Sequence, residues 1–278
     1  MATNLWQEHF VMYELQTVMR QKDKDFAETL NRIREGNQTQ DISMISSCTI
    51  NEDHQPNESD SIHLFISNEL VEQYNQQAFD RANTQKVSVR AKDTIVGSVS
   101  DNLRQSILDH LPTDPKKTMQ LYTTLQLATD LRYDVSINVR IEDGITNGAS
   151  CIIKKLCISG NNPTGTVWVE FNDKNVGGMT RKDNKCLYKK GILPSWTPIK
   201  PITRQFNPRK QYQVIRMHFP LRPASAKTVH RSQGDTVDQL YIDFKGRPQP
   251  HLHSVALSRV TTLYRTSSTQ LCVRQENC

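Results

Sequence analysis

The stretch 226–236, AKTVHRSQGDT, gathers hydrogen-bonding side chains around a single glycine. Only Ala226 and Val229 are apolar, so the stretch does not have the pattern of a core helix or a core strand. Hydroxyl and amide groups can reach phosphate oxygens, Lys227 adds positive charge, and Gly234 lets the backbone come close to a ligand. These residue types favour the binding of an oxyanion, with a plain polar turn as the alternative.

A second segment, 253–261 with the sequence HSVALSRVT, ends an apolar run with a single arginine, Arg259. Together, KTVHRSQGDT and VALSRVT closely resemble the last two ATPase motifs of the Pif family of DNA helicases. They are most similar to the branch that Helitron-type transposons carry. The resemblance implies an α/β fold, namely the second RecA-like motor domain of a P-loop NTPase.

Near the N-terminus, Arg20 and Gln21 precede a predicted helix. Asp23 is suited to cap this helix, and apolar residues recur at positions i, i+4 and i+7. The residues alone are compatible with an ordinary surface arginine at position 20. The segment ELQTVMRQKDKDFAETLNRIREG, however, resembles the Pif motif whose arginine reaches the terminal phosphate of the nucleotide. The resemblance therefore gives Arg20 a catalytic role and places Gln21 at the nucleotide. Further upstream, Phe10, Val11, Met12 and Leu15 could line a short buried strand or its approach, and the polar residues 46–61 are predicted to form a loop.

Residues 62–81 are predicted to form a strand and then a helix, with Ser67 and Asn68 between them. Ligands of open α/β sheets bind at the carboxyl ends of the strands, which is where this pair lies. A helix cap at Asn68 is the alternative. The resemblance assigns both residues to contact with the DNA backbone.

The middle of the chain has a pattern of short antiparallel strands instead of the alternating strands and helices of an α/β sheet. Residues 86–118 are read as a connector, with a short helix possible near 103–111. Residues 121–171 hold short alternating strands, with Val135, Ile137, Val139 and Ile141 among the inward positions, and DG and NG turns. They resemble the small antiparallel β-barrel, of the Src-homology-3 kind, that Pif helicases insert into the second motor domain. The predicted divisions are 1–118, 119–203 for the inserted barrel and its connector, and 204–278.

The resemblance also assigns roles within the two motifs. Arg259 corresponds to the arginine finger and, with Gly234, contacts the nucleotide. The residues that correspond to DNA contacts in the first motif are Thr228, His230, Ser232 and Gln233.

Two motifs of a complete motor are absent from the sequence. There is no Gly-x-x-x-x-Gly-Lys-Ser/Thr loop for phosphates and no acidic pair after an apolar strand for magnesium. ATP and Mg²⁺ are therefore expected only together with a first motor domain. No counterpart of that domain precedes Trp6, and the likeness fades after Leu263. We expect a truncated copy or an incomplete gene model that is inactive alone.

Composition sets further bounds. The chain has 278 residues, 36% of them hydrophobic, and a formal net charge of +6. It has neither an apolar run of membrane-spanning length nor a secretory signal, and its six cysteines and eight histidines show no metal-ligand spacing. A nuclear or otherwise intracellular protein, not secreted, with reduced thiols and no metal site or membrane partner is expected. The range 204–231 has seven Lys or Arg and no Asp or Glu, which fits either a polyanion partner or a solvated basic face.

The leading functional hypothesis is the C-terminal portion of an ATP-dependent 5'–3' DNA helicase. It would act on single-stranded or duplex DNA in repair, recombination, telomere maintenance or transposition. Its partners would be single-stranded DNA and a first RecA-like domain. The alternatives are a non-catalytic fragment that binds single-stranded nucleic acid and a relic without function.

Overall fold

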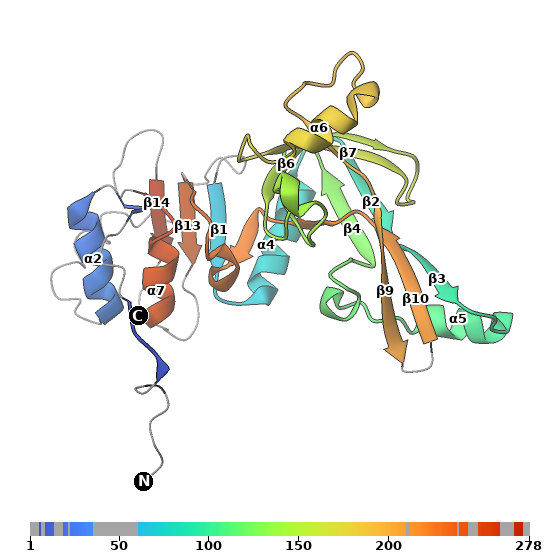
Figure 1. The fold of residues 1–278 in the computed structure, drawn as a ribbon, viewed down its shortest axis with the longest axis horizontal. Coiled ribbons are helices and arrows are strands. Elements are labelled where there is room, and N and C mark those ends of the chain that lie inside the picture. The colour runs from blue at the N-terminus through green and yellow to red at the C-terminus, as the bar shows by residue number, and fades with distance from the viewer. Residues whose placement is uncertain are drawn as a thin grey trace, which may run out of the picture.

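The computed structural model describes residues 6, 9–13, 19–21, 23–35, 61–209, 212–237, 239–243, 250–261 and 270–274. They form two regions that lie side by side (Figure 1). The parallel region comprises the described residues of 19–81 and 226–274, and the antiparallel region comprises those of 86–223. Helix α4 lies on the side of the parallel sheet that faces the antiparallel region (Figure 1).

A parallel sheet forms the centre of the parallel region. Its strand order is β12 (Ala226–Thr228), β1 (Ser61–Phe65), β13 (Gln239–Asp243) and β14 (Gln270–Arg274). Helices α2 (Lys24–Glu35) and α7 (Pro250–Leu257) share one hydrophobic core with one face of this sheet, whereas α4 (Asn68–Arg81) packs on the other face.

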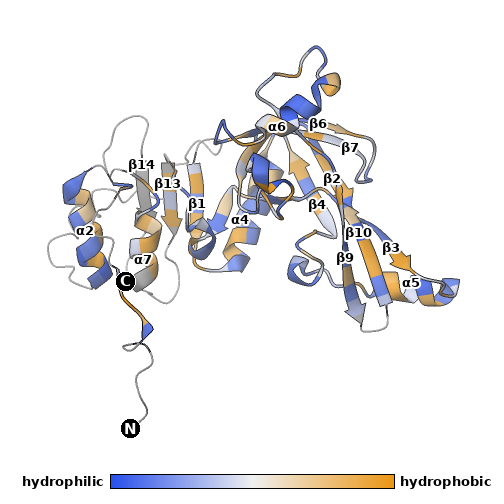
Figure 2. Cartoon of the chain, viewed as in Figure 1, coloured by the Kyte–Doolittle hydropathy of each residue, from blue (hydrophilic) through white to orange (hydrophobic). Residues whose placement is uncertain are grey.

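The alternation of side chains along β1 explains this layering. Ile62 and Leu64 point to one face and pack in the core beneath α2 and α7. His63 and Phe65 point to the other face, where both rings contact Tyr74 of α4. The middle residues of β13 and the apolar residues of β1 are buried, as expected for parallel strands covered on both faces, and both strands carry hydrophobic segments (Figure 2).

Side-chain caps fix where two helices begin. The carboxylate of Asp23 accepts from the backbone N–H groups of Asp25 at 3.0 Å and Phe26 at 3.3 Å, so the predicted cap of α2 is confirmed. Helix α4 is capped by the Ser67 hydroxyl, which accepts from the Leu70 N–H at 3.2 Å. The alternative that Asn68 is the cap is wrong, because Asn68 is the first residue inside the helix.

The antiparallel region contains three sheets. The largest is open and has the order β11–β5–β6–β7–β8, and the smaller ones pair β3–β10–β9 and β2–β4. The predicted antiparallel sheet is confirmed, but no pairing among the described residues closes it into a barrel. The strands are β2 (Lys86–Arg90), β3 (Lys92–Val96), β4 (Thr124–Ala128), β5 (Arg132–Val135), β6 (Ser150–Ile158), β7 (Gly165–Phe171), β8 (Thr197–Ile199), β9 (Ile202–Arg209), β10 (Tyr212–His218) and β11 (Leu221–Pro223).

Several local predictions in this region are wrong. The expected connector 86–118 contains β2 and β3, because both strands find partners far along the chain in β4 and β10. The possible short helix near 103–111 is confirmed as α5 (Asp101–Asp109). The predicted strand, with alternating inward and outward side chains, does not continue through residues 137–141. Strand β5 ends at Val135, and Ile141, which begins a single helical turn, is 67% exposed. The domain boundaries at 118 and 203 stay predictions.

The short elements between these strands are helical turns. They are η1 (Pro115–Lys117), η2 (Ile141–Asp143), α6 (Gly178–Asp183) and η3 (Lys185–Leu187). The predicted DG and NG turns are present, since Gly144 and Gly148 have φ values of 72° and 93°.

The basic run between 204 and 231 is not one solvated face. Arg216 is fully buried and forms two 2.8 Å contacts with the carboxylate of Asp93. Arg222 and Lys227 face acidic residues too, as described below. The sequence segment lacks acids, but the fold supplies them from other strands.

The N-terminal residues 10–12 are exposed by 60–83%, so the predicted buried strand there is wrong. Leu15 and residues 46–60 of the predicted loop lie outside the described residues, whereas Ser61, the last residue of that loop, begins β1. Within the described part, none of the helices has the length and apolar character needed to cross a bilayer.

A buried histidine predicts a pH dependence of stability. Burial, assisted by the positive charge of Arg81, lowers the pKa of His63 to about 3. Between about pH 6.5 and this value the unfolded chain binds a proton that the folded chain does not. The free energy of unfolding should therefore fall on acidification, by up to about 1.4 kcal/mol per pH unit from this residue. In the variant His63→Phe, the free energy of unfolding measured by urea denaturation should depend less on pH than in the wild type.

The exposed His110 provides the matched control for this experiment. The variant His110→Phe should retain the wild-type dependence on pH. If the free energy of unfolding changed equally with pH in the wild type and in His63→Phe, the expected effect would be contradicted.

Candidate functional site

The first motif forms a short strand, a turn and a loop. Strand β12 leads into η4 (Val229–Ser232). The hydroxyl of Thr228 accepts from the Arg231 N–H at 3.4 Å, and the Ser232 hydroxyl donates to the Val229 carbonyl at 2.8 Å. Both hydroxyls are buried and hold the turn together. Their predicted roles as DNA contacts stay predictions.

The outer side of this turn is open to solvent. His230, Arg231, Gln233 and Gly234 are all exposed. Gly234 has φ +95°, in the region that favours glycine, and no heavy atom lies within 4 Å of the position that a Cβ would occupy. Glycine is thus required here by the backbone conformation, and the side of the loop that carries it is accessible.

Arg259 lies just after helix α7 and donates back to the polypeptide around it. Its Nε donates to the Val255 carbonyl at 2.9 Å, and its Nη2 donates to the Ser258 hydroxyl at 2.7 Å. Its Nη1 reaches the Ser232 carbonyl of the first motif at 3.2 Å. The two motifs therefore meet through this guanidinium group.

Two residues of the N-terminal segment, Arg20 and Gln21, contact the same part of the structure as Arg259. Arg20 donates to the Ser258 carbonyl at 3.2 Å and, at the longer distance of 3.5 Å, to the Gly234 carbonyl. Gln21 is buried, and its amide donates to the carbonyls of Ser258 at 3.1 Å and Val260 at 3.2 Å. Arg20, Gln21, Gly234 and Arg259 are thus brought together at the end of α7, although their functional roles stay predictions.

Ser258 is the residue at this junction that sequence reasoning missed. Its carbonyl accepts from both Arg20 and Gln21, and its hydroxyl accepts from Arg259 and donates to the Val255 carbonyl at 2.8 Å. Its position directly before Arg259, within an apolar segment, was the only signal in the sequence.

The junction is electropositive. Burial lowers the pKa of Arg259, the nearby Arg20 guanidinium lowers it further, and Asp235 partly opposes both. A guanidinium group has five N–H donors, and the contacts above use three on Arg259 and two on Arg20. Donors remain for a ligand on both residues, and an oxyanion would relieve the repulsion between them.

A groove with a cavity volume of about 320 Å³ lies between α4 and the antiparallel region. Asn68 of α4 and Arg231 of the first motif both line it, whereas Ser67 is used as the helix cap. Burial raises the pKa of Tyr122 in this groove, and the charges of Arg231 and Arg222 oppose that rise. The basic side chains that line the groove are Lys116, Arg132, Arg222 and Arg231.

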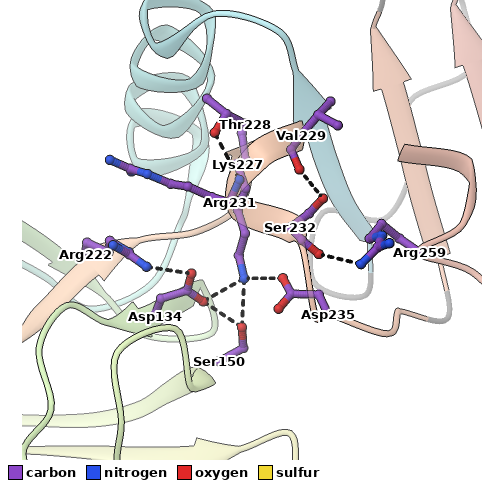
Figure 3. A network of polar contacts seen from close by, with 12 residues as sticks. Asp134, Ser150, Arg222, Lys227, Thr228, Val229, Arg231, Ser232, Asp235 and Arg259 are labelled. Carbon is purple, nitrogen blue, oxygen red and sulfur yellow. Dashed lines mark hydrogen bonds and ion pairs between the residues drawn. The ribbon is translucent and has the colours of Figure 1, made fainter. Parts of the chain in front are cut away.

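Lys227 is buried against two carboxylates, so its ammonium group is not available to an oxyanion and its predicted role there is wrong. It is only 3% exposed, and its ammonium group lies 2.9 Å from oxygens of Asp134, Ser150 and Asp235 (Figure 3). Asp134 and Ser150 belong to β5 and β6 of the antiparallel region. No local pattern could have identified them, because their partner is far away in the sequence.

No protein-family model and no curated protein sequence matches the chain. Solved structures do match. A Pif1 helicase from Candida albicans superposes with a TM-score of 0.61 at 19% identity, over 94% of this chain and 56% of that one. A Bacteroides Pif1 helicase in complex with ADP-AlF3 and single-stranded DNA gives 0.59 at 20% identity, over 94% and 51%. Bacteroides Pif1 bound to single-stranded DNA gives 0.58 at 19% identity, over 92% and 50%.

These matches establish the fold. The chain has the mixed α/β, RecA-like architecture of Pif1 helicases over nearly all of its length, and it spans about half of the solved chains that it matches.

The loop glycine gives a test of the site's geometry. Replacing Gly234 by alanine should lower the free energy of unfolding by about 1–3 kcal/mol, because an L-residue is strained at its φ of +95°. Chemical denaturation measures this. Gly178→Ala is the control, since Gly178 has no positive φ and its added Cβ would lie no closer than 3.8 Å to a neighbour. A loss in the control equal to that in Gly234→Ala would refute strain as the cause.

Proposed function

We propose that this chain is the C-terminal portion of an ATP-dependent DNA helicase of the Pif type. In this proposal it contributes one wall of a nucleotide site and part of a track for single-stranded DNA. The convergence of Arg20, Gln21, Gly234 and Arg259 on the end of α7 is the observation that carries the proposal.

The nucleotide side of the proposal follows from charge. Arg259 and Arg20 each retain unused N–H donors beside an accessible glycine backbone, an arrangement suited to phosphate oxygens. Arg259 would stabilise negative charge that develops during phosphoryl transfer, the role of an arginine finger. A phosphate loop and magnesium ligands would come from a first motor domain, because the sequence contains neither motif. ATP and Mg²⁺ would thus bind between two domains.

The DNA side rests on the groove and the exposed part of η4. Asn68, at the first turn of α4, shares the groove with Arg231, and His230 and Gln233 are exposed close by in sequence. Four basic side chains line the groove against two acidic ones, Glu72 and Asp114, so its lining is net positive. With the aromatic ring of Tyr122, it provides what single strands need, namely phosphate contacts and a surface for bases. The Bacteroides structures with single-stranded DNA are consistent with this proposal.

The same groove supports a second candidate, a module that binds single-stranded nucleic acid without catalysis. It requires only the basic side chains of the groove and neither Arg20 nor Arg259. ATP turnover separates the two candidates, because only the helicase portion would take part in it.

We further propose that the helicase moves 5'–3' and has an intracellular, nuclear role in DNA repair, recombination, telomere maintenance or transposition.

The purified chain alone should show no ATP turnover with or without single-stranded DNA. In a chimaera that joins it to the phosphate-loop domain of a Pif1 helicase, DNA-stimulated turnover should appear. There Arg259→Ala should lower kcat by about a thousand-fold or more. Arg259→Lys should restore little, because a lysine lacks the planar donor fork.

Lys190, which is exposed and does not line the groove, provides the control for this assay. The variant Lys190→Ala should keep the kcat of the unmodified chimaera. Full turnover in folded Arg259→Ala would remove the arginine-finger assignment, and turnover by the isolated chain would contradict the need for a second domain.

Single-stranded DNA should bind the purified chain in a salt-dependent manner. The logarithm of the association constant should fall by about 0.7 per neutralised phosphate for each log unit of salt. Arg231→Ala should weaken binding and reduce this slope by about 0.7, whereas Lys190→Ala should change neither. Fluorescence anisotropy with an oligothymidylate measures both quantities. Affinity that does not depend on salt would count against a phosphate track.

A further inference from the structure

Lys227 is a buried cation shared by two carboxylates. Its ammonium group makes three 2.9 Å contacts, to Asp134 Oδ1, Asp235 Oδ2 and the Ser150 hydroxyl (Figure 3). Ser150 in turn donates to Asp134 Oδ1 at 2.6 Å. The ammonium group donates hydrogen bonds to Ser150 and Asp235 and forms an ion pair with Asp134, so two carboxylates share its one positive charge. Any change in charge on one side of Lys227 must therefore alter its contacts on the other.

The network joins the two parts of the proposed site. On one side, Arg222 lines the groove, and its Nη2 lies 3.8 Å from Asp134 Oδ2. On the other side, Asp235 directly follows Gly234, whose carbonyl accepts from Arg20. The order of contacts from the groove to the arginine pair is Arg222, Asp134, Lys227, Asp235, Gly234 and Arg20.

The two carboxylates differ in their access to water. The side chain of Asp134 is 3% exposed and that of Asp235 is 23% exposed. Asp235 can therefore replace its contact with Lys227 by hydration, while Asp134 cannot. A buried carboxylate that loses one cation must hold the remaining one more closely. The contact between Arg222 and Asp134 is the longest in the network, so it is the one that a competing anion in the groove would break most easily.

We propose that Lys227 is a positioning residue that couples occupancy of the groove to the loop at Gly234. When a phosphate of single-stranded DNA draws Arg222 away from Asp134, Lys227 follows Asp134 and releases Asp235. The loop 233–237 then loosens beneath Arg20 and Arg259. This inference rests on the proposed binding of DNA in the groove, and it places the signal path through the antiparallel region rather than along the first motif alone.

Amide hydrogen exchange of the full chain tests the coupling. The N–H of Asp235 donates to the Ser232 carbonyl at 3.0 Å, and that of Val237 donates to the Arg259 carbonyl at 3.1 Å. Saturation with an oligothymidylate should speed exchange at these two amides by about five-fold or more in the wild-type chain. In Lys227→Met and in Arg222→Met the same saturation should change exchange less than about two-fold.

Lys116→Met is the matched control, because Lys116 lines the groove and lies outside the network. It should weaken DNA binding and yet retain the full response once saturated. A role of Lys227 in stability alone would raise exchange throughout the antiparallel region without removing the response to DNA, and that result would overturn the proposal.

A second variant keeps the test decisive if Lys227→Met does not fold. Asp235→Asn removes the partly exposed carboxylate and leaves the buried pair of Lys227 with Asp134 intact. Without DNA its loop should already exchange about five-fold faster than in wild type, with no further response to DNA. Wild-type binding of DNA without faster exchange at Asp235 and Val237 would refute the coupling alone. An absence of DNA binding would refute both the coupling and the proposed track.

Discussion

The main-chain carbonyls at the end of helix α7 hold the candidate site together. The Ser258 carbonyl accepts from Arg20, which is 238 positions away in the sequence, and from Gln21 beside it. Carbonyls at the end of a helix lack partners within the helix, so they are available to donors from elsewhere. Arg20, Gln21 and Arg259 supply these donors, and the N-terminal segment is thereby fixed against the two C-terminal motifs.

This arrangement leaves two guanidinium groups close together and held on neutral oxygens. Burial and the charge of Arg20 lower the pKa of Arg259, so the folded chain carries an electrostatic cost at this place. An anion would reduce that cost, which is the physical reason to expect a phosphate there.

Unlike Arg20 and Arg259, which contact neutral oxygens, the buried Arg216 and Lys227 are paired with groups of opposite charge. Arg216 with Asp93, and Lys227 with Asp134 and Asp235, join strands and loops that are distant in sequence. Removing one partner of such a set leaves a charge without compensation, so the members depend on one another. In the Lys227 network this dependence extends from the groove to the loop at Gly234, which gives the two regions a shared electrostatic element.

Local patterns in the sequence determined the caps, periods and turns: Asp23 before α2, the strand before Ser67, and Gly234 in its loop. These features depend on neighbours within a few positions, and motif likeness singled out Arg20 and Arg259 as candidate site residues. The tertiary structure alone decided the open sheet, the strands within 86–96 and the burial of Arg216 and Lys227. Their partners lie far away in sequence, 123 positions for Arg216 with Asp93 and 77 for Lys227 with Ser150. Charge and alternation in one segment cannot specify a partner at such a distance, because only the completed fold brings the two segments together.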